Sequence, residues 1–253
     1  MGTRRCTRIF QGSWRKALIG KGREEKLCCT PQEASVPGRS CTLAPVWHTC
    51  ALLAWLTVFA AVLAYLRVGT DHPRVGHILF CSTAILFEWG VFAFTIWRAT
   101  PAFIDYVAQA FRNGRGLLWD VAAALTLCLV SSLIAPLMVR ILGTSGWASL
   151  EGMRPNNLIE RAFWIATSIS AGISEEIVFR GYLQKQLSGW TSYESVGILG
   201  QAAIFGLVHG YQGWKNMALV FILGAIFGTA VFLRRGLRAN MIAHAIMDAL
   251  AAF

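Results

Sequence analysis

Long runs of apolar residues, separated by short polar connections, dominate the chain from position 46 onward. The runs are too long for strands, and about 20 apolar residues suffice to cross a hydrocarbon layer of ~30 Å. We therefore predict an all-α, polytopic membrane bundle of about seven transmembrane helices. The predicted spans are Val46–Leu66, His77–Trp97, Leu117–Val139, Leu158 to about Leu187, Ser195–Trp214, Asn216–Leu233 and the short Ala239–Phe253.

Charge divides the chain into three regions. Residues 1–45 hold nine Lys/Arg and three Glu and contain no apolar run, so we expect a disordered, basic cytoplasmic tail. Such a tail is attracted to anionic lipid headgroups, and it lacks any recognisable nucleic-acid-binding motif. Residues 46–157 form three N-terminal transmembrane helices, and residues 158–253 form a C-terminal group of helices. We expect membrane lipids as partners, and no nucleic acid.

The distribution of cations predicts the orientation. Only 14% of the 253 residues are charged, against about 25% in soluble domains. With the N-terminus in the cytoplasm, 16 Lys/Arg lie on the cytoplasmic side and 6 on the opposite side. The positive-inside rule therefore favours a cytoplasmic N-terminus and a C-terminus outside.

Ionisable residues concentrate in the late helices. An ionisable side chain at the bilayer centre costs about 2.5–3.5 kcal/mol, so Glu175, Glu176, Arg180 and Asp248 must face one another or a water-filled cavity. Glu176 and Arg180 are four residues apart and can pair on one helical face. Glu175 is rotated by ~100° from Glu176, which leaves its carboxylate available for chemistry.

Two further spacings bring polar residues onto single helix faces. Phe205 and His209 are four residues apart, and Asn240, His244 and Asp248 follow each other at the same interval. By contrast, Glu88 and Asp120 each stand alone in a span, and we expect packing or end positions for them. The seven cysteines contain no Cys-x-x-Cys pair and are expected to be free thiols.

Three motifs in the C-terminal region resemble those of a known family. They are Glu175-Glu176-Ile177-Val178-Phe179-Arg180, then Phe205-Gly206-Leu207-Val208-His209, then His244-Ala245-Ile246-Met247-Asp248. In this order they resemble the Glu-Glu-x3-Arg, Phe-x3-His and His-x3-Asn/Asp signatures of the CPBP intramembrane proteases. That family includes type II CAAX prenyl endopeptidases and bacterial abortive-infection and bacteriocin-immunity proteins.

The resemblance implies an intramembrane endopeptidase that cleaves a membrane-associated protein or peptide. It implies that Glu175 is the general base, that His209 orients or activates water, and that His244 and Asp248 lie on the oxyanion side. Glu176 and Arg180 would support them, together with Phe205 and Asn240. Because an ionised aspartate cannot donate a hydrogen bond, Asp248 is either protonated or holds His244 in place.

Several alternatives stay open at this stage. The preferred interpretation needs no cofactor, but Glu175, His209 and His244 could instead be zinc ligands with an open fourth position. A proton-coupled transporter also uses intramembrane carboxylates and histidines, and an immunity or binding protein could keep the scaffold without catalysis. The short loops are typical of a bacterial protein, so we expect the cytoplasmic membrane of a bacterium. Whether the substrate is prenylated stays open.

Overall fold

The computed structural model describes residues 42–67, 76–112, 116–143, 155–250 and 253. Every element in these ranges is a helix, which confirms the all-α class. The predicted basic tail lies almost entirely outside the described residues. In chain order the helices are α1 (Val46–Arg67), α2 (His77–Trp97), α3 (Pro101–Arg112), α4 (Leu117–Leu142), α6 (Leu158–Glu175), the π-helix η2 (Glu176–Leu183), α7 (Gln184–Thr191), α8 (Glu194–Val208), the 3₁₀-helix η3 (His209–Gln212), α9 (Trp214–Arg234) and α10 (Arg238–Leu250).

Five helical stretches in the described residues are long and apolar enough to cross a membrane. They are Val46–Tyr65, His77–Trp97, Leu117–Leu142, Leu158–Thr191 and Trp214–Arg234. The chain is therefore an integral membrane protein. The predicted count of seven is not confirmed, because α8 has 15 residues and α10 has 13, fewer than the about 20 that a span requires. The orientation of the bundle stays a prediction.

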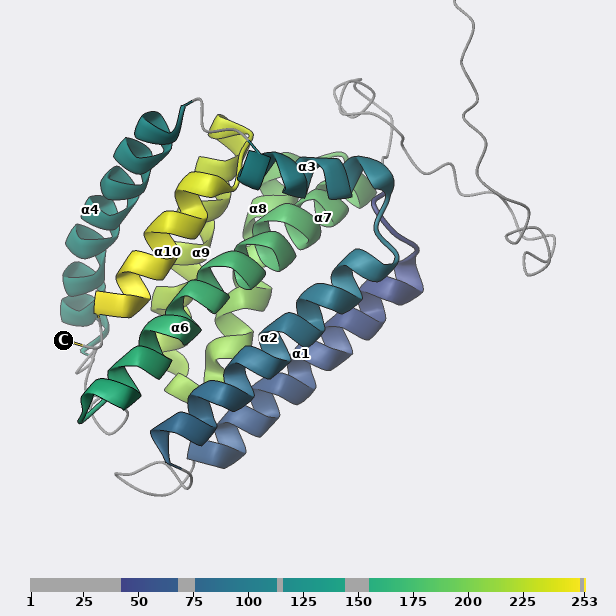
Figure 1. Cartoon of the computed structure of the whole chain (residues 1–253). Coiled ribbons are helices and arrows are strands. Elements are labelled where there is room, and N and C mark those ends of the chain that lie inside the picture. Colours follow the sequence, from purple (N-terminus) through teal and green to yellow (C-terminus); the bar gives the residue numbers. More distant parts are fainter. Residues whose placement is uncertain (1–41, 68–75, 113–115, 144–154, 251–252) are drawn as a thin grey trace, which may run out of the picture.

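Helix α3 corresponds to no element predicted from the sequence. It lies across one end of the bundle, over α7 and α8 (Figure 1). The hydroxyl of Thr100 caps it by accepting a hydrogen bond from the amide of Phe103 at 3.3 Å, and Phe103 and Val107 are buried on its inner side. A short amphipathic helix between two spans lacks the length that marks a transmembrane segment.

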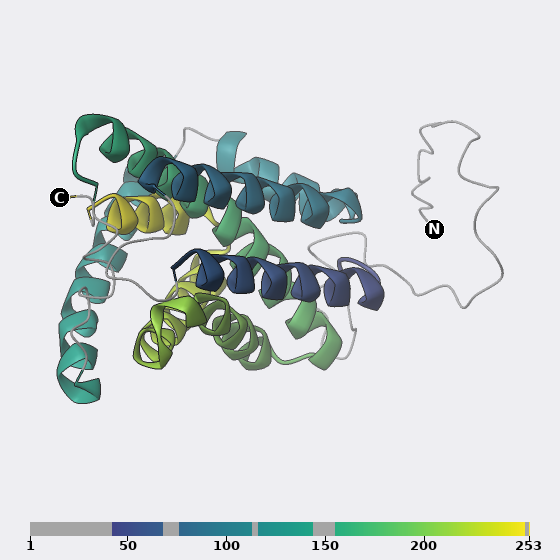
Figure 2. The same ribbon diagram turned by 90° about the horizontal axis from the view of Figure 1, so that it is seen from below.

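Helix α4 stands at the edge of the bundle in both Figure 1 and Figure 2. Glycines with positive φ flank it, Gly116 at 88° and Gly143 at 60°, a conformation that other residues adopt at a cost. Asp120 near its start accepts from Arg234 at 2.8 Å and lies 3.2 Å from Arg238. The expectation of a paired packing residue is confirmed for Asp120.

Close packing of α8 on α9 depends on two glycines. A Cβ at Gly224 would lie 3.2 Å from Ala202, and one at Gly228 would lie 2.6 Å from the side chain of Gln201. The amide group of Gln201 donates to the carbonyl of Gly224 at 2.8 Å, and that of Gln184 donates to Gly228 at 3.0 Å. Small residues at this spacing let membrane helices approach closely, so that side chains of one helix reach the backbone carbonyls of the other.

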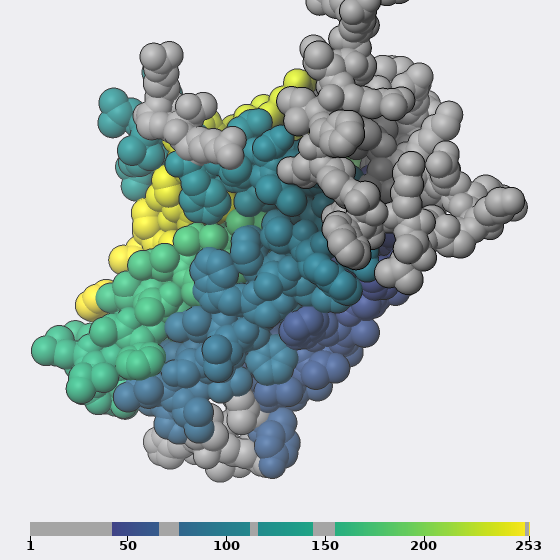
Figure 3. Space-filling model, turned by 45° about the vertical axis from the view of Figure 1, so that its right-hand side comes forward, coloured from purple at the N-terminus to yellow at the C-terminus, as the bar shows by residue number. Residues whose placement is uncertain are grey.

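The N-terminal helices attach to the C-terminal ones through a buried cluster around Tyr182. Its hydroxyl lies 3.0 Å from Nδ1 of His48 and 2.8 Å from Oγ1 of Thr49, both on α1. The other ring nitrogen of His48 donates to the carbonyl of Phe94 on α2 at 2.9 Å. On the face shown in Figure 3, α2 lies between α6 and α1. This arrangement brings α2 against the helix that carries Glu175.

Candidate active site

Glu175 occupies the junction between an α-helix and a π-helix. The side chain of Asn157 caps α6 by accepting from the amide of Glu160 at 2.9 Å, and α6 then continues to Glu175. Over Glu176–Leu183 the backbone widens, and the amide of Gln184 bonds the carbonyl of Phe179, five residues earlier. Such π-turns are rare and occur frequently at functional sites.

Glu176 and Arg180 form a fully buried ion pair, as their spacing predicts. Nη1 of Arg180 lies 3.1 Å from Oε1 of Glu176, and the side chains are 1% and 0% exposed. The guanidinium also stands over the ring of Phe205, 4.1 Å from its centroid. Nδ2 of Asn240 donates to Oε2 of Glu176 at 3.3 Å and to the carbonyl of Phe227 at 2.9 Å. The carboxylate of Glu176 is therefore held by Asn240 and His244 as well as by Arg180, whereas Nε and Nη1 of Arg180 have no hydrogen-bond partner among the described residues.

His244 lies between three carboxylates. Its Nδ1 is 2.9 Å from Oε1 of Glu176, and its Nε2 is 3.4 Å from Oδ2 of Asp248 and 3.7 Å from Oε2 of Glu175. Glu176 therefore orients the ring of His244 through Nδ1. Nε2 faces Glu175 and Asp248, the two carboxylates that are more exposed to solvent. The Asn240–His244–Asp248 stripe predicted on one helix face is present on α10.

His209 lies where α8 ends, not inside a longer helix. The predicted span Ser195–Trp214 is divided here, because α8 stops at Val208 and the 3₁₀-helix η3 begins. Nδ1 of His209 lies 2.8 Å from the carbonyl oxygen of Phe205. A carbonyl only accepts, so Nδ1 carries the hydrogen and, in the neutral ring, Nε2 keeps its lone pair. The rings of Phe205 and His209 are 4.6 Å apart.

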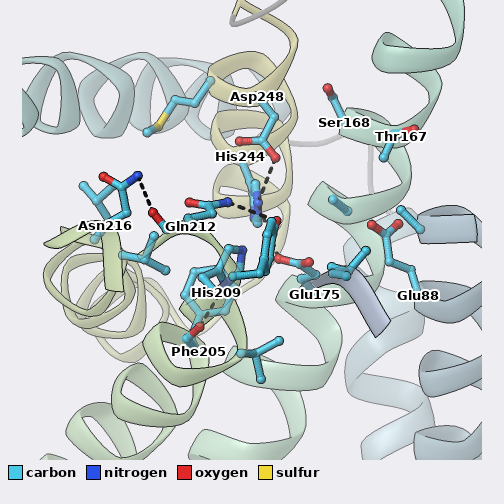
Figure 4. A pocket seen from close by; sticks show the side chains of 18 of the residues that line it. Glu88, Thr167, Ser168, Glu175, Phe205, His209, Gln212, Asn216, His244 and Asp248 are labelled. Carbon is cyan, nitrogen blue, oxygen red and sulfur yellow. Dashed lines mark hydrogen bonds and ion pairs between the residues drawn. The ribbon is translucent and has the colours of Figure 1, made fainter. Parts of the chain in front are cut away.

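These side chains line one cavity of about 250 Å³. Glu175, His209, His244 and Asp248 all contribute to its wall, as do Phe205 and Arg180, whereas Glu176 and Asn240 lie behind His244. Figure 4 shows residues of α6, α10 and the α8–η3 corner converging on this space. Most of the remaining lining side chains are apolar and come from α1, α2, α4 and α9. The structure thus brings together the three motifs that the sequence separates.

Comparison with known proteins agrees with the motifs. Residues 157–250 match the family model described as type II CAAX prenyl endopeptidase Rce1-like. The C-terminal helices are therefore similar to this family. Neither the curated proteins nor the solved structures yielded a match to the chain. The matched residues run from the N-cap of α6 to the end of α10, so they include all three motifs.

Of the three carboxylates that line the cavity among the described residues, Glu88 was not predicted as a site member. Glu88 on α2 is 7% exposed and lines the cavity beside the Rce1-like motifs. Oε2 of Glu88 accepts a hydrogen bond from Ser170 on α6 at 2.5 Å, so the expected paired packing position is confirmed, and the same side chain also borders the cavity. A lone glutamate in an apolar span gives no sequence signal that distinguishes a cavity wall from a helix contact.

The possible zinc ligands named above are Glu175, His209 and His244. Within the described ranges, no three His, Cys, Asp or Glu side chains are grouped to hold a metal ion. Nδ1 of His244 is engaged by Glu176, and its Nε2 faces Asp248 as well as Glu175. A catalytic zinc site needs three ligands about 2.0–2.2 Å from one point.

Proposed function

We propose that this protein is an intramembrane endopeptidase that hydrolyses a peptide bond of a membrane-associated protein or peptide. The observation that carries the proposal is the shared cavity, whose wall holds Glu175, His209 and His244 within an apolar helix bundle. Peptide hydrolysis needs a base for water, a donor for the oxyanion and partial exclusion of bulk solvent. The mostly apolar wall suits the lipid-embedded part of a substrate.

Glu175 is the general base in this proposal. Its Oε2 makes no hydrogen bond within the described residues, and Glu176, not Glu175, makes the ion pair with Arg180. The lone pair on Nε2 of His209 accepts one hydrogen of the attacking water, while the carboxylate of Glu175 takes the other. The resulting hydroxide attacks the scissile carbonyl carbon.

His244 is the oxyanion donor. Carboxylates face both of its ring nitrogens, which suits an imidazolium that donates on both sides. Glu176 holds Nδ1, so Nε2 can exchange its contacts with Asp248 and Glu175 for the developing oxyanion. The side chain of Asp248 is 47% exposed. In this proposal, Asp248 is an ionised carboxylate that positions His244, so it does not need to carry a proton.

The test is cleavage of a panel of membrane peptides by the purified full-length protein. The panel contains a prenylated C-terminal peptide, the same peptide without its lipid, and a transmembrane peptide. We expect Glu175→Gln to lower kcat at least about 100-fold, the scale of general-base catalysis, with the wild-type fold retained. Full cleavage by Glu175→Gln would remove the proposal.

A chelator arm separates the two chemistries considered for the site. Cleavage that survives chelation supports glutamate catalysis, whereas loss that is restored by zinc supports the metal alternative. Binding of a panel peptide without any cleavage would favour an immunity or binding protein on the same scaffold.

The bacterial cytoplasmic membrane stays the proposed location.

A further inference from the structure

Glu88 is a buried carboxyl group that the proposed chemistry does not yet use. It comes from α2, outside the residues 157–250 that match the family. Among the described residues, Ser170 donates a hydrogen bond to its Oε2. None of the ion pairs among the described residues involves Glu88. An ionised carboxylate held this way in a membrane bundle is costly.

Glu88 and Glu175 border the same two spaces. Both line the main cavity, and both line a second cavity of about 20 Å³. The small cavity has room for about one water, and its polar wall consists of Glu88, Ser174 and Glu175. A water there has the two or three polar partners that a buried water requires. A water in the small cavity would connect the two carboxyl groups, and both groups also line the main cavity (Figure 4).

The surroundings of the two carboxyl groups differ in charge. Oε2 of Glu175 lies 3.7 Å from Nε2 of His244, and a cation there favours the ionised form of Glu175. Glu88 has a hydroxyl neighbour and no ion-pair partner among the described residues. The other titratable groups of the cavity are Cys81 on α2, Arg180 on η2, His209 and Tyr211 on η3, and His244 and Asp248 on α10. When two carboxyl groups share a poorly solvated cavity, one keeps a proton, and this asymmetry assigns that proton to Glu88.

We propose that Glu88 is the general acid of the reaction, donating its proton to the leaving amine. This inference rests on the proposed function. Glu175 takes a proton from water, and the hydroxide adds to the carbonyl carbon to give the oxyanion. Collapse of the oxyanion breaks the C–N bond as the nitrogen receives the proton of Glu88. The proton on Glu175 then returns to the Glu88 carboxylate through the small cavity, which leaves the enzyme as it started.

The experiment compares wild type with Glu88→Gln on a peptide that wild type cleaves and on the same sequence with an ester at the scissile bond. Glutamine keeps the size of the side chain and an oxygen for Ser170, but it has no proton to give. An alkoxide leaves more readily than an amide anion, so the ester depends less on a general acid. We expect kcat to fall about 100-fold on the peptide and less than about 5-fold on the ester, with KM little changed.

Two variants complete the test. Glu88→Asp keeps the acid on a shorter stem and should recover part of the peptide activity. Asp120→Asn makes the same carboxyl-to-amide change on α4, outside the cavity, and should retain wild-type kcat on both substrates. Equal losses on peptide and ester in Glu88→Gln would overturn the proposal in favour of a structural role, as would unchanged peptide cleavage.

Failure of the wider assignment would look different. If the protein is not a glutamate-dependent protease, Glu175→Gln leaves both activities in place or wild type cleaves neither substrate. If only the acid assignment fails, Glu175→Gln abolishes cleavage of both substrates, while Glu88→Gln shows no preference for the ester.

Discussion

The helices on either side of residue 157 use buried polar groups in opposite ways. In α6–α10, several buried polar side chains form one network, in which Glu176 contacts Arg180, Asn240 and His244. In α1 and α2, packing is mainly aromatic, as in the stacked rings of Phe59 and Phe87, 5.0 Å apart. The C-terminal part therefore holds a preorganised site, whereas the N-terminal part supplies walls and one isolated carboxyl group. A family motif can describe the first contribution but not the second.

The largest stability effect should come from breaking the buried pair of the C-terminal part. Glu176→Met leaves the guanidinium of Arg180 buried without its carboxylate, which should destabilise the protein by about 3–5 kcal/mol. The double variant Glu176→Met/Arg180→Met removes both charges and should recover most of that loss. Thermal unfolding in detergent measures both variants. Cleavage should be lost in both, because His244 loses the group that holds Nδ1. A double variant as unstable as the single one would contradict this account of the pair.

A smaller effect should follow from weakening the contact between the two parts. Tyr182→Phe removes the hydroxyl that contacts His48 and Thr49 and should cost about 1–2 kcal/mol. The activity of the folded fraction should be unchanged, since Tyr182 does not line the cavity. Tyr193→Phe is the matched control, because Tyr193 is 67% exposed, and it should unfold like wild type. A reduced kcat in folded Tyr182→Phe would mean that α1 influences the site more directly than its contacts indicate.

The smallest effect should come from the ion pairs that join α4 to the C-terminal part. Asp120 and Arg234 are 23% and 35% exposed, so Asp120→Asn should cost less than about 1 kcal/mol, and the difference should shrink as salt is added. Unfolding midpoints at two ionic strengths measure this. A large loss that is independent of salt would show that these groups are shielded from solvent and that α4 is held more strongly than the exposed pair suggests.

Helical spacing was enough to predict much of the C-terminal site. The ion pair of Glu176 with Arg180, the neighbours Phe205 and His209, and the stripe on α10 are all contacts between residues four apart. They depend only on a local helix, which the apolar runs predict well. Even the π-turn after Glu175 keeps Arg180 within reach of Glu176. Their catalytic roles stay predictions, as does the division of the chain into three regions.

Contacts between distant segments were beyond the same reasoning. Glu88 meets Ser170 across 82 positions, and nothing in the α2 sequence indicates which helix it faces. The limits of α8 were missed because a charge-free run does not reveal the 3₁₀-turn at His209–Gln212. Helix α3 was not predicted because it is only 12 residues long, too short to be recognised as a span. In each case, tertiary packing decides what the hydrophobic pattern leaves open.

The hydrogen bond between His209 and the backbone makes the two ring nitrogens of His209 different from each other. Nδ1 is committed to the carbonyl of Phe205, and changing tautomer would break that bond. The ring can therefore exchange protons only through Nε2 and cannot pass them from one of its edges to the other. In the proposed reaction, His209 therefore acts only through Nε2 and does not relay protons through α8.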